Sequence, residues 1–478
     1  MSSLSRSSVL NPPDLPPETL SSENGPDSEK KPEIPKSCRL GKYGALWFLV
    51  LAAALILRIA FAFYWQEHIT APSEKGKLSS RDGSFFFGDS DSYWKLGRQL
   101  AFGRPYEFDE QRHWTYFRMP GYPALLVPLF RIGGENPPVL AARCLNCLFG
   151  VCTVALTGWL AYLLFQNQII ALLAAFAAAV EPFSVVQSVL ILAEEPFVSA
   201  MLMQIILFVL FIKNFQERFA GYALFFGLFS AWTVYFRPSW YYFPVFLFCW
   251  GLLFLFAQKR FFSSLIRYGA FFLLAGIVFC LCLSPWWIRN YRLSGQFIPT
   301  TLQMGASLYD GLSPQATGSS NMEFIDAFRR EEELSGSDSR EPFEVRLDRR
   351  LKKASLDWSR ENPGQVVWLA GIKFFRLWNP VPNEPAFSSF KIRIILFFTS
   401  VPLMILGIAG FISTLKKGTI YGVLWLPAVY LTGLHVIFVS SVRYRMPAMY
   451  GFMIAAAWIL WKILQSRGGG LEKVPKSG

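Results

Sequence analysis

Charged residues are scarce in this sequence of 478 residues. Asp, Glu, Lys and Arg together make up 17% of it, whereas hydrophobic residues make up 53%. A soluble protein of this length needs more charge on its surface, and several apolar runs reach the roughly 20 residues that a helix needs to cross about 30 Å of hydrocarbon. The composition therefore excludes an ordinary soluble enzyme and predicts an all-α polytopic membrane protein.

Histidine and cysteine are also sparse. The three histidines have no neighbouring Cys/His set, so we predict no metal site and no cofactor, and a divalent cation is not supported. The seven cysteines lie in the N-terminal tail or in apolar runs, which leaves the hydrophilic segments without a disulfide framework. Cys144 and Cys147 have the spacing of a redox or metal pair, but inside an apolar helix they are expected to be small packing residues.

Motifs for nucleotide chemistry are missing as well. There is no G-x-x-x-x-G-K-[ST] phosphate loop and no G-x-G-x-x-G after a strand. Asp89-Ser90-Asp91 has the D-x-D form with which soluble sugar-nucleotide transferases hold a metal, but no alternating strand and helix domain surrounds it. The net charge of +13 comes without an aromatic-interleaved basic patch, so nucleic acid is not an expected partner.

Apolar runs dominate what is present, and we expect about ten membrane spans. They are Ala45–Trp65, Val139–Phe165, Ile169–Val186, Phe197–Ile212, Phe219–Phe236, Tyr241–Ala257, Tyr268–Pro285, Ile392–Ile412, Ile420–Phe438 and Ala448–Leu464. The short connections that carry Lys and Arg fall on the same side as both chain ends, and the positive-inside rule makes that side cytoplasmic. We therefore expect a multi-pass protein of the cell membrane, the inner or plasma membrane, with both termini in the cytoplasm.

The hydrophilic segments define the domain organisation. Residues 1–42 contain seven prolines and are expected to form a disordered cytoplasmic tail, and residues 465–478 a second cytoplasmic tail. Residues 43–464 are expected to form the transmembrane domain. Its two long loops, 66–138 and 286–393, face outward, and their length makes them candidates for the chemistry.

Acidic and basic residues gather at the predicted outer ends of the spans. They are Arg58, Asp89, Asp91, Arg118, Glu194, Glu195, Arg237, Arg289, Arg443 and Arg445. Charge at a membrane boundary is costly unless it has a partner or a function. A carboxylate can take the proton from an attacking hydroxyl, and arginine forks can neutralise a leaving phosphate. The set therefore suits transfer of a group from a lipid phosphate.

Simpler interpretations exist for the same residues. Asp89 and Asp91 could cap a helix that starts near Tyr93, because Asp before a helix satisfies its free N–H groups. The two glutamates could form a solvated turn, and the outer arginines could reach for lipid headgroups. Arg58 could pair with an acid for structural reasons.

Six motifs follow one another along the chain. They are Asp89-Ser90-Asp91-Ser92-Tyr93, Leu100 to Tyr106, Arg118-Met119-Pro120-Gly121-Tyr122-Pro123, Glu194-Glu195-Pro196-Phe197, Pro285 to Tyr291 and Arg443-Tyr444-Arg445-Met446-Pro447. This series resembles the bacterial membrane glycosyltransferases of the GT-C fold, the group that includes the protein O-mannosyltransferases and the lipid A aminoarabinose transferases (glycosyltransferase family 39-like). The likeness extends from about Gly44 to Leu464.

The resemblance implies roles for individual residues. Asp89 matches the catalytic base by its spacing to Tyr93, with Asp91 as the alternative. Glu194 matches a second acidic site, with Glu195 as the alternative, because Glu-Glu-Pro stands where the family usually has one acid and a small residue. Arg443 or Arg445 match phosphate binders. Apart from the resemblance, the remaining expected contacts to donor phosphate or substrate are Tyr93, Arg58, Arg118, Glu195, Arg237 and Arg289.

We therefore expect a glycosyltransferase that moves a hexosyl or pentosyl group, with inversion, from a polyprenyl-phosphate donor. The acceptor would be a hydroxyl of a lipid, glycan or protein on the extracytoplasmic face. The alternative is a polytopic transporter or flippase of lipids or sugars without transferase activity. Such proteins usually show internal repeats and polar groups at mid-membrane, whereas this sequence has no visible repeat and its charges gather at one face.

Overall fold

The computed structural model describes residues 40–68, 85, 87–108, 114–214, 218–257, 261–335, 341–382 and 389–467. Within these residues the secondary structure is helical and has no strand, only an isolated bridge between Phe108 and Trp114. The predicted all-α class is confirmed. Most of the predicted tail 1–42 and of the predicted tail 465–478 lies outside the described residues.

The helices follow one another along the whole described chain. They are α1 Leu40–His68, α2 Gly88–Ala101, α3 Gly121–Gly133, α4 Val139–Phe165, α5 Gln168–Val180, α6 Pro182–Val189, α7 Glu194–Lys213, α8 Phe219–Phe236, η1 Pro238–Trp240, α9 Phe243–Ala257, α10 Phe261–Ser294, α11 Met304–Gly311, α12 Phe324–Ser335, α13 Phe343–Glu361, α14 Pro363–Trp378, α15 Phe390–Leu415, η3 Thr419–Leu424, α16 Leu426–His435 and α17 Val442–Arg467.

Eight helices in the described residues are long and apolar enough to cross a membrane, so this is a multi-pass membrane protein. Their ranges are Tyr43–His68, Val139–Phe165, Glu194–Lys213, Phe219–Phe236, Pro238–Ala257, Ser264–Ser294, Phe390–Leu415 and Val442–Arg467. A ninth span is formed if α5 and α6, which bend by 58° at their junction, are taken together. The expected number of ten is not confirmed.

Prolines explain why two of the predicted spans, 169–186 and 420–438, are not single long helices. A proline lacks the backbone N–H and is accommodated best in the first turn of a helix. Pro182 accordingly starts a new helix, and Glu181 accepts a hydrogen bond from the Ser184 backbone at 2.6 Å as its cap. Pro427 likewise forces the apolar run 420–438 to begin again as α16, which is only ten residues long.

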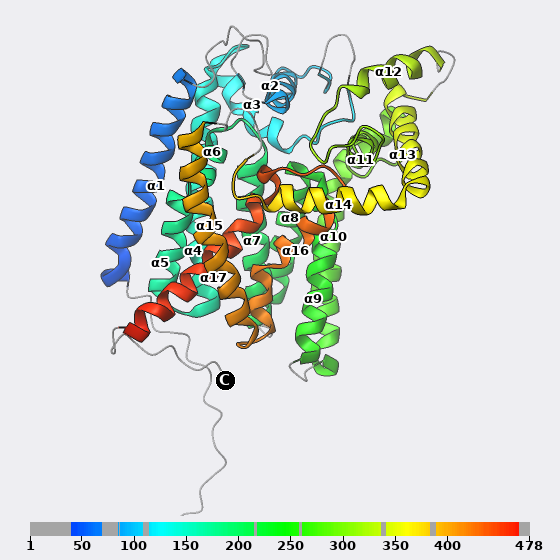
Figure 1. The fold of residues 1–478 in the computed structure, drawn as a ribbon. Coiled ribbons are helices and arrows are strands. Elements are labelled where there is room, and N and C mark those ends of the chain that lie inside the picture. Colours follow the sequence, from blue (N-terminus) through cyan, green and yellow to red (C-terminus); the bar gives the residue numbers. More distant parts are fainter. Residues whose placement is uncertain are drawn as a thin grey trace, which may run out of the picture. The chain divides into compact units, whose positions relative to one another are not determined.

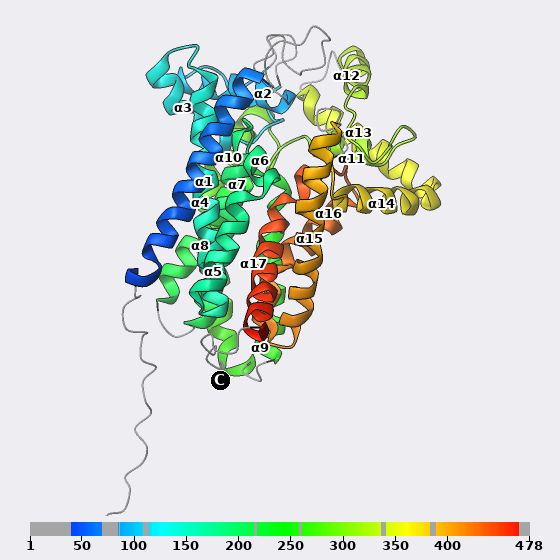
Figure 2. The same cartoon turned by 60° about the vertical axis from the view of Figure 1, so that its left-hand side comes forward.

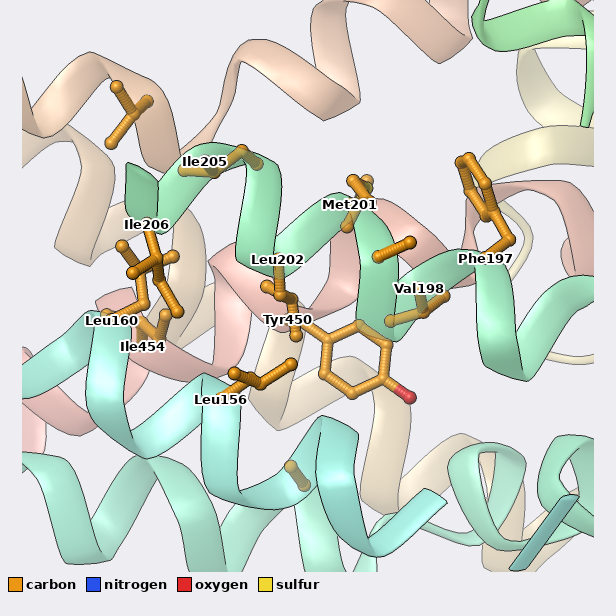
Figure 3. Packing of buried hydrophobic residues seen from close by; sticks show 14 of the residues in the cluster. Leu156, Leu160, Phe197, Val198, Met201, Leu202, Ile205, Ile206, Tyr450 and Ile454 are labelled. Atoms are coloured by element: carbon orange, nitrogen blue, oxygen red, sulfur yellow. The ribbon is translucent and has the colours of Figure 1, made fainter. Parts of the chain in front are cut away.

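The buried core surrounds α7, which packs against α4 and α8. Figure 3 shows buried side chains of this core from α7, α4 and α17. Those labelled there are Leu156, Leu160, Phe197, Val198, Met201, Leu202, Ile205, Ile206, Tyr450 and Ile454, and all are buried. Because Glu194 is the first residue of this helix, the core fixes the position of a charged group at the edge of the bundle.

The two long loops meet at one end of the helix bundle. α2 and α3 of the first loop and α11, α12 and α13 of the second lie together there in both Figure 1 and Figure 2. α17 starts nearer to this end and runs toward the opposite end (Figure 1). The loops and the first turns of α7 and α17 can therefore contribute to one site.

Candidate active site

Asp89 and Asp91 lie in the first turn of α2, which begins at Gly88 and not near Tyr93. The residue before the helix is Phe87, and no side chain caps it, so the helix-capping interpretation is wrong. The two acids have different partners. Asp91 binds Lys95 at 3.0 Å on the exposed side of the helix. Asp89 binds Arg118 at 2.5 Å and Arg443 at 3.1 Å.

Arg118 reaches Asp89 from the turn that precedes α3. Its guanidinium also donates to Ser92 Oγ at 3.2 Å and to Gln303 Oε1 at 3.3 Å, and it lies over the Tyr93 ring. The turn is held by Gly121, where a Cβ atom would come within 2.5 Å of the Tyr235 carbonyl oxygen. A glycine is therefore required for α3 to approach α8 this closely.

Arg443 connects the first loop to the helix core. Its Nη2 donates to Asp89 Oδ2, and its Nε donates to Glu194 Oε1 at 3.0 Å. Glu194 also faces Arg237, with Nη1 3.7 Å from the same oxygen. The position of Glu194 at the first turn of α7 further stabilises its negative charge through the helix dipole. These residues form one sequence of alternating charges, Arg118–Asp89–Arg443–Glu194–Arg237, which we call the ion-pair chain.

The arginines dominate the electrostatics of Asp89. Burial raises the pKa of this carboxyl group, but Arg118 and Arg443 lower it by more, so that the pKa of Asp89 lies well below its ordinary value. Burial also raises the pKa of the Tyr93 hydroxyl to about 12. At neutral pH, Asp89 is therefore ionised and Tyr93 is a neutral hydrogen-bonding group.

A cavity of about 600 Å³ lies against the ion-pair chain. Both outer loops and the segment before α17 contribute to its lining. Among the lining residues are Asp89, Tyr93, Arg118, Glu194, Arg237, Gln303, Met304, Asp348, Lys352, His435, Arg443 and Tyr444. In the described part of the chain, no three or more His, Cys, Asp or Glu side chains come together in a group that could hold a metal.

Other expected site residues lie elsewhere. Arg58 donates to the carbonyls of Ala178 and Ala179, both at 2.9 Å, and so satisfies acceptors that the break after α5 leaves free. Arg289 donates to the Thr115 carbonyl at 3.1 Å and to the Tyr106 carbonyl at 3.3 Å, and so joins the outer loops.

Arg445 and Glu195 also point away from the cavity. Arg445 is buried and donates to the carbonyls of Leu377 and Asn379 at the end of α14. Glu195 is fully buried. The described lining of the cavity includes neither of them, nor Asp91, Arg58 or Arg289. The sequence left three alternatives open, Asp89 or Asp91, Glu194 or Glu195, and Arg443 or Arg445. In each of them the first residue lines the cavity.

Sequence reasoning missed several lining residues. Gln303 and Asp348 give no signal, because polar residues in a long loop are common. His435 stacks on Tyr444 with ring centroids 4.6 Å apart, and its Nδ1 donates to the Val439 carbonyl at 2.8 Å. Its position just upstream of the Arg443 motif was the one available hint.

Comparisons with known proteins bear on this arrangement. The family model of dolichyl-phosphate-mannose-protein mannosyltransferases matches residues 129–297. No curated protein matches the sequence. The oligosaccharyltransferase of Archaeoglobus fulgidus, tethered to an acceptor peptide, is similar in structure with a TM-score of 0.55 and 13% identity, over 90% of this chain and 51% of that one. The apo form of the same enzyme has a TM-score of 0.52 and 14% identity, over 91% of this chain and 53% of that one.

ArnT from Cupriavidus metallidurans, bound to undecaprenyl phosphate, gives a lower TM-score of 0.43 with 13% identity, over 87% of this chain and 77% of that one. The present chain spans about half the length of the oligosaccharyltransferases that it matches. The resemblance to the protein mannosyltransferases is thus confirmed within residues 129–297, and the chain has the GT-C fold of membrane glycosyltransferases.

Proposed function

We propose that this protein is a glycosyltransferase that moves one sugar from a polyprenyl-phosphate donor to an acceptor hydroxyl. The observation that carries the proposal is the ion-pair chain at the cavity, where the carboxylate of Asp89 is held between Arg118 and Arg443. It places a proton acceptor within a few ångströms of guanidinium groups that can bind a phosphate. The mannosyltransferase family model supports the same reaction class.

In the proposed reaction the acceptor oxygen attacks the anomeric carbon of the sugar. The bond between that carbon and the phosphate oxygen breaks, the polyprenyl phosphate leaves with the bonding electrons, and Asp89 takes the acceptor proton. A single displacement inverts the anomeric carbon. The transferred group is a hexosyl or pentosyl group that fits the cavity.

The low pKa of Asp89 makes it a weak base while both arginines hold it. A donor phosphate at Arg118 and Arg443 competes with Asp89 for the same N–H donors. Because the pairing weakens when the donor arrives, the pKa of Asp89 rises toward working pH. Donor binding and activation of the base are therefore one event in this proposal.

The donor class is supported by the membrane setting of the site. The cavity joins charged residues to apolar ones such as Phe236, Phe297 and Phe438, which suits a phosphate with a lipid chain. The Archaeoglobus oligosaccharyltransferase has been solved in complex with an inhibitory peptide and a dolichol-phosphate. We place the reaction on the extracytoplasmic face of the cell membrane, with both termini in the cytoplasm, because the basic connections lie opposite the two long loops. The acceptor is a lipid, a glycan or a protein.

The transferase is tested with the full protein in lipid nanodiscs. Radiolabelled polyprenyl-phospho-mannose, -glucose and -arabinose are each offered with a pool of membrane lipid, glycan and protein acceptors. Movement of label from the donor to one acceptor class supports the proposal. If no sugar moves, and vesicles containing the protein instead carry the intact labelled lipid from one leaflet to the other, the transporter alternative is correct.

A further inference from the structure

The helix α14 has two faces of different character. Val367, Trp368, Phe374 and Phe375 are exposed by 73%, 62%, 42% and 74%, and their spacing places them on one side of the helix. We call these four residues the α14 stripe. The opposite side carries the buried residues Leu369, Lys373 and Leu377. An uncharged apolar surface of this kind is costly to expose to water.

The direction of α14 differs from that of the spans. In Figures 1 and 2 it crosses the long axes of the neighbouring span helices instead of running along them, close to the end of the bundle where the outer loops lie. With 16 residues it is not among the helices that qualify as spans. This direction is typical of a helix that lies along a membrane boundary.

The next helix along the chain, α15, also exposes large apolar residues. α15 qualifies as a membrane span, and its first turns expose Phe390 by 77%, Ile395 by 55% and Phe398 by 69%. These residues face lipid because a span has no water around its outer side. Trp and Phe residues favour the boundary between headgroups and acyl chains.

We propose that α14 lies in the plane of the outer membrane interface, with its stripe inserted among the lipids. The occupant of the exposed face is the bilayer itself. The direction of α14 across the spans, its place near the outer-loop end of the bundle and its exposed Trp368 and Phe375 favour lipid over a protein partner.

Lys373 on the buried side and Trp378 in the last turn of α14 hold the segment that leads to the candidate active site. Lys373 Nζ donates to the Ile437 carbonyl at 2.6 Å, and Trp378 Nε1 donates to Thr432 Oγ1 at 3.1 Å. The chain runs from there through Val439 to Arg443 in the ion-pair chain. Insertion of the stripe therefore fixes Arg443 at a defined depth relative to the lipid phosphate, a consequence that rests on the proposed function.

The depth of α14 can be measured without any activity. A fluorescent amino acid is incorporated at Phe375 in the full protein, in nanodiscs with lipids brominated along the acyl chains. The matched control is Leu334 of α12, which is 83% exposed in the outer loop. We expect blue-shifted, strongly quenched emission at 375 and unquenched emission at 334. Equal, weak quenching at both positions would overturn the proposal.

A second variant addresses the link to the site. Trp368→Ser with Phe375→Ser should raise the KM for the lipid donor, whereas Leu334→Ser should leave it unchanged. Folding is checked by thermal stability in detergent, where no bilayer contact is at stake. If the labelled helix lies in the membrane but wild-type protein transfers no sugar, the proposed function fails and the membrane contact stands. A folded double variant with an unchanged donor KM overturns the link between the stripe and Arg443.

Discussion

Asp89 gains its chemical character from neighbours that are distant in sequence. Arg118 lies in the following loop and Arg443 in the last helix, yet both bind its carboxylate. Asp91, two residues away, binds Lys95 on the solvent-accessible side of α2. The contrast arises because side chains two positions apart on a helix point in different directions. It makes Asp91 a control for every experiment on Asp89.

Replacement of Asp89 by Asn should abolish sugar transfer, because the amide cannot take the acceptor proton. Donor binding should remain, since Arg118 and Arg443 keep their charges. Asp91→Asn should retain near-normal turnover, because an exposed ion pair contributes little to stability. Turnover and donor binding of the purified variants are compared. Substantial turnover by Asp89→Asn would show that Asp89 is not the base.

Arg443→Lys tests the fork that joins two acids. Lysine keeps the charge, but its single nitrogen cannot replace both Nη2, which binds Asp89, and Nε, which binds Glu194. We expect the KM for the donor to rise about tenfold, which corresponds to about 1.4 kcal/mol. Arg131→Lys, on the exposed side of α3, is the control with the same chemical change. Equal donor KM values in the two variants would exclude a forked contact of Arg443 with the phosphate.

Glu344 gives a pH dependence to the outer loops. It accepts backbone hydrogen bonds from Thr115 at 2.7 Å and Tyr116 at 3.1 Å, and burial raises its pKa to about 7. Between pH 4.5 and 7 the folded state therefore binds more protons than the unfolded state, so stability falls as pH rises through this range, by at most about 3 kcal/mol.

Melting temperatures in detergent at pH 5 and pH 7.5 measure this effect. The wild-type protein should lose thermal stability at the higher pH, and Glu344→Gln should lose less. The amide oxygen of glutamine can still accept the Thr115 hydrogen bond, and the amide carries no charge to desolvate. The same decrease in both proteins would mean that another group is responsible.

At the scale of elements, the sequence predicted where the apolar helices lie better than where they end. Pro182 and Pro427 were inside the expected spans, and their missing N–H groups set helix starts there. The candidate site was predicted in part. The acids and arginines of the ion-pair chain were all among the predicted site residues. Arg58 and Arg445, which bind backbone carbonyls, could not be distinguished from Arg443, which lines the cavity, because local sequence does not show which partner a guanidinium binds.

Gly121 fixes the contact between α3 and α8. A Cβ atom would lie 2.5 Å from the Tyr235 carbonyl oxygen, so Gly121→Ala forces the two elements apart and moves Arg118 away from Asp89. We expect a loss of stability of about 1–3 kcal/mol together with lower turnover.

Gly221 of α8 provides the matched control, because a Cβ atom added there would meet no other atom within 4 Å. Gly221→Ala should therefore keep or raise the melting temperature, since alanine favours the helix. The two alanine variants are compared by thermal melting in detergent and by transfer assay. Equal melting temperatures would show that the α3–α8 contact is not tight.

At the scale of the whole molecule, the proposed orientation puts the two long loops outside and the basic connections in the cytoplasm. The proposed orientation is tested with cysteines at Leu334 and Ser466, both exposed. An impermeant maleimide should label Leu334→Cys in intact cells and Ser466→Cys only after the membrane is opened. The parent protein, with its native cysteines, gives the background. Labelling of Ser466→Cys in intact cells would place the end of α17 outside.

The ion-pair chain also sets the balance of charge between the site and its substrate. Its three arginines and two carboxylates carry a formal charge of +1, which balances the single negative charge of a sugar phosphodiester. In the proposed reaction the proton that reaches Asp89 raises this charge to +2, while the departing phosphate monoester approaches −2. Substrate and product complexes are thus both near neutrality. The spent carrier then leaves readily only after Asp89 has passed its proton to water, which couples turnover to proton release at the outer face.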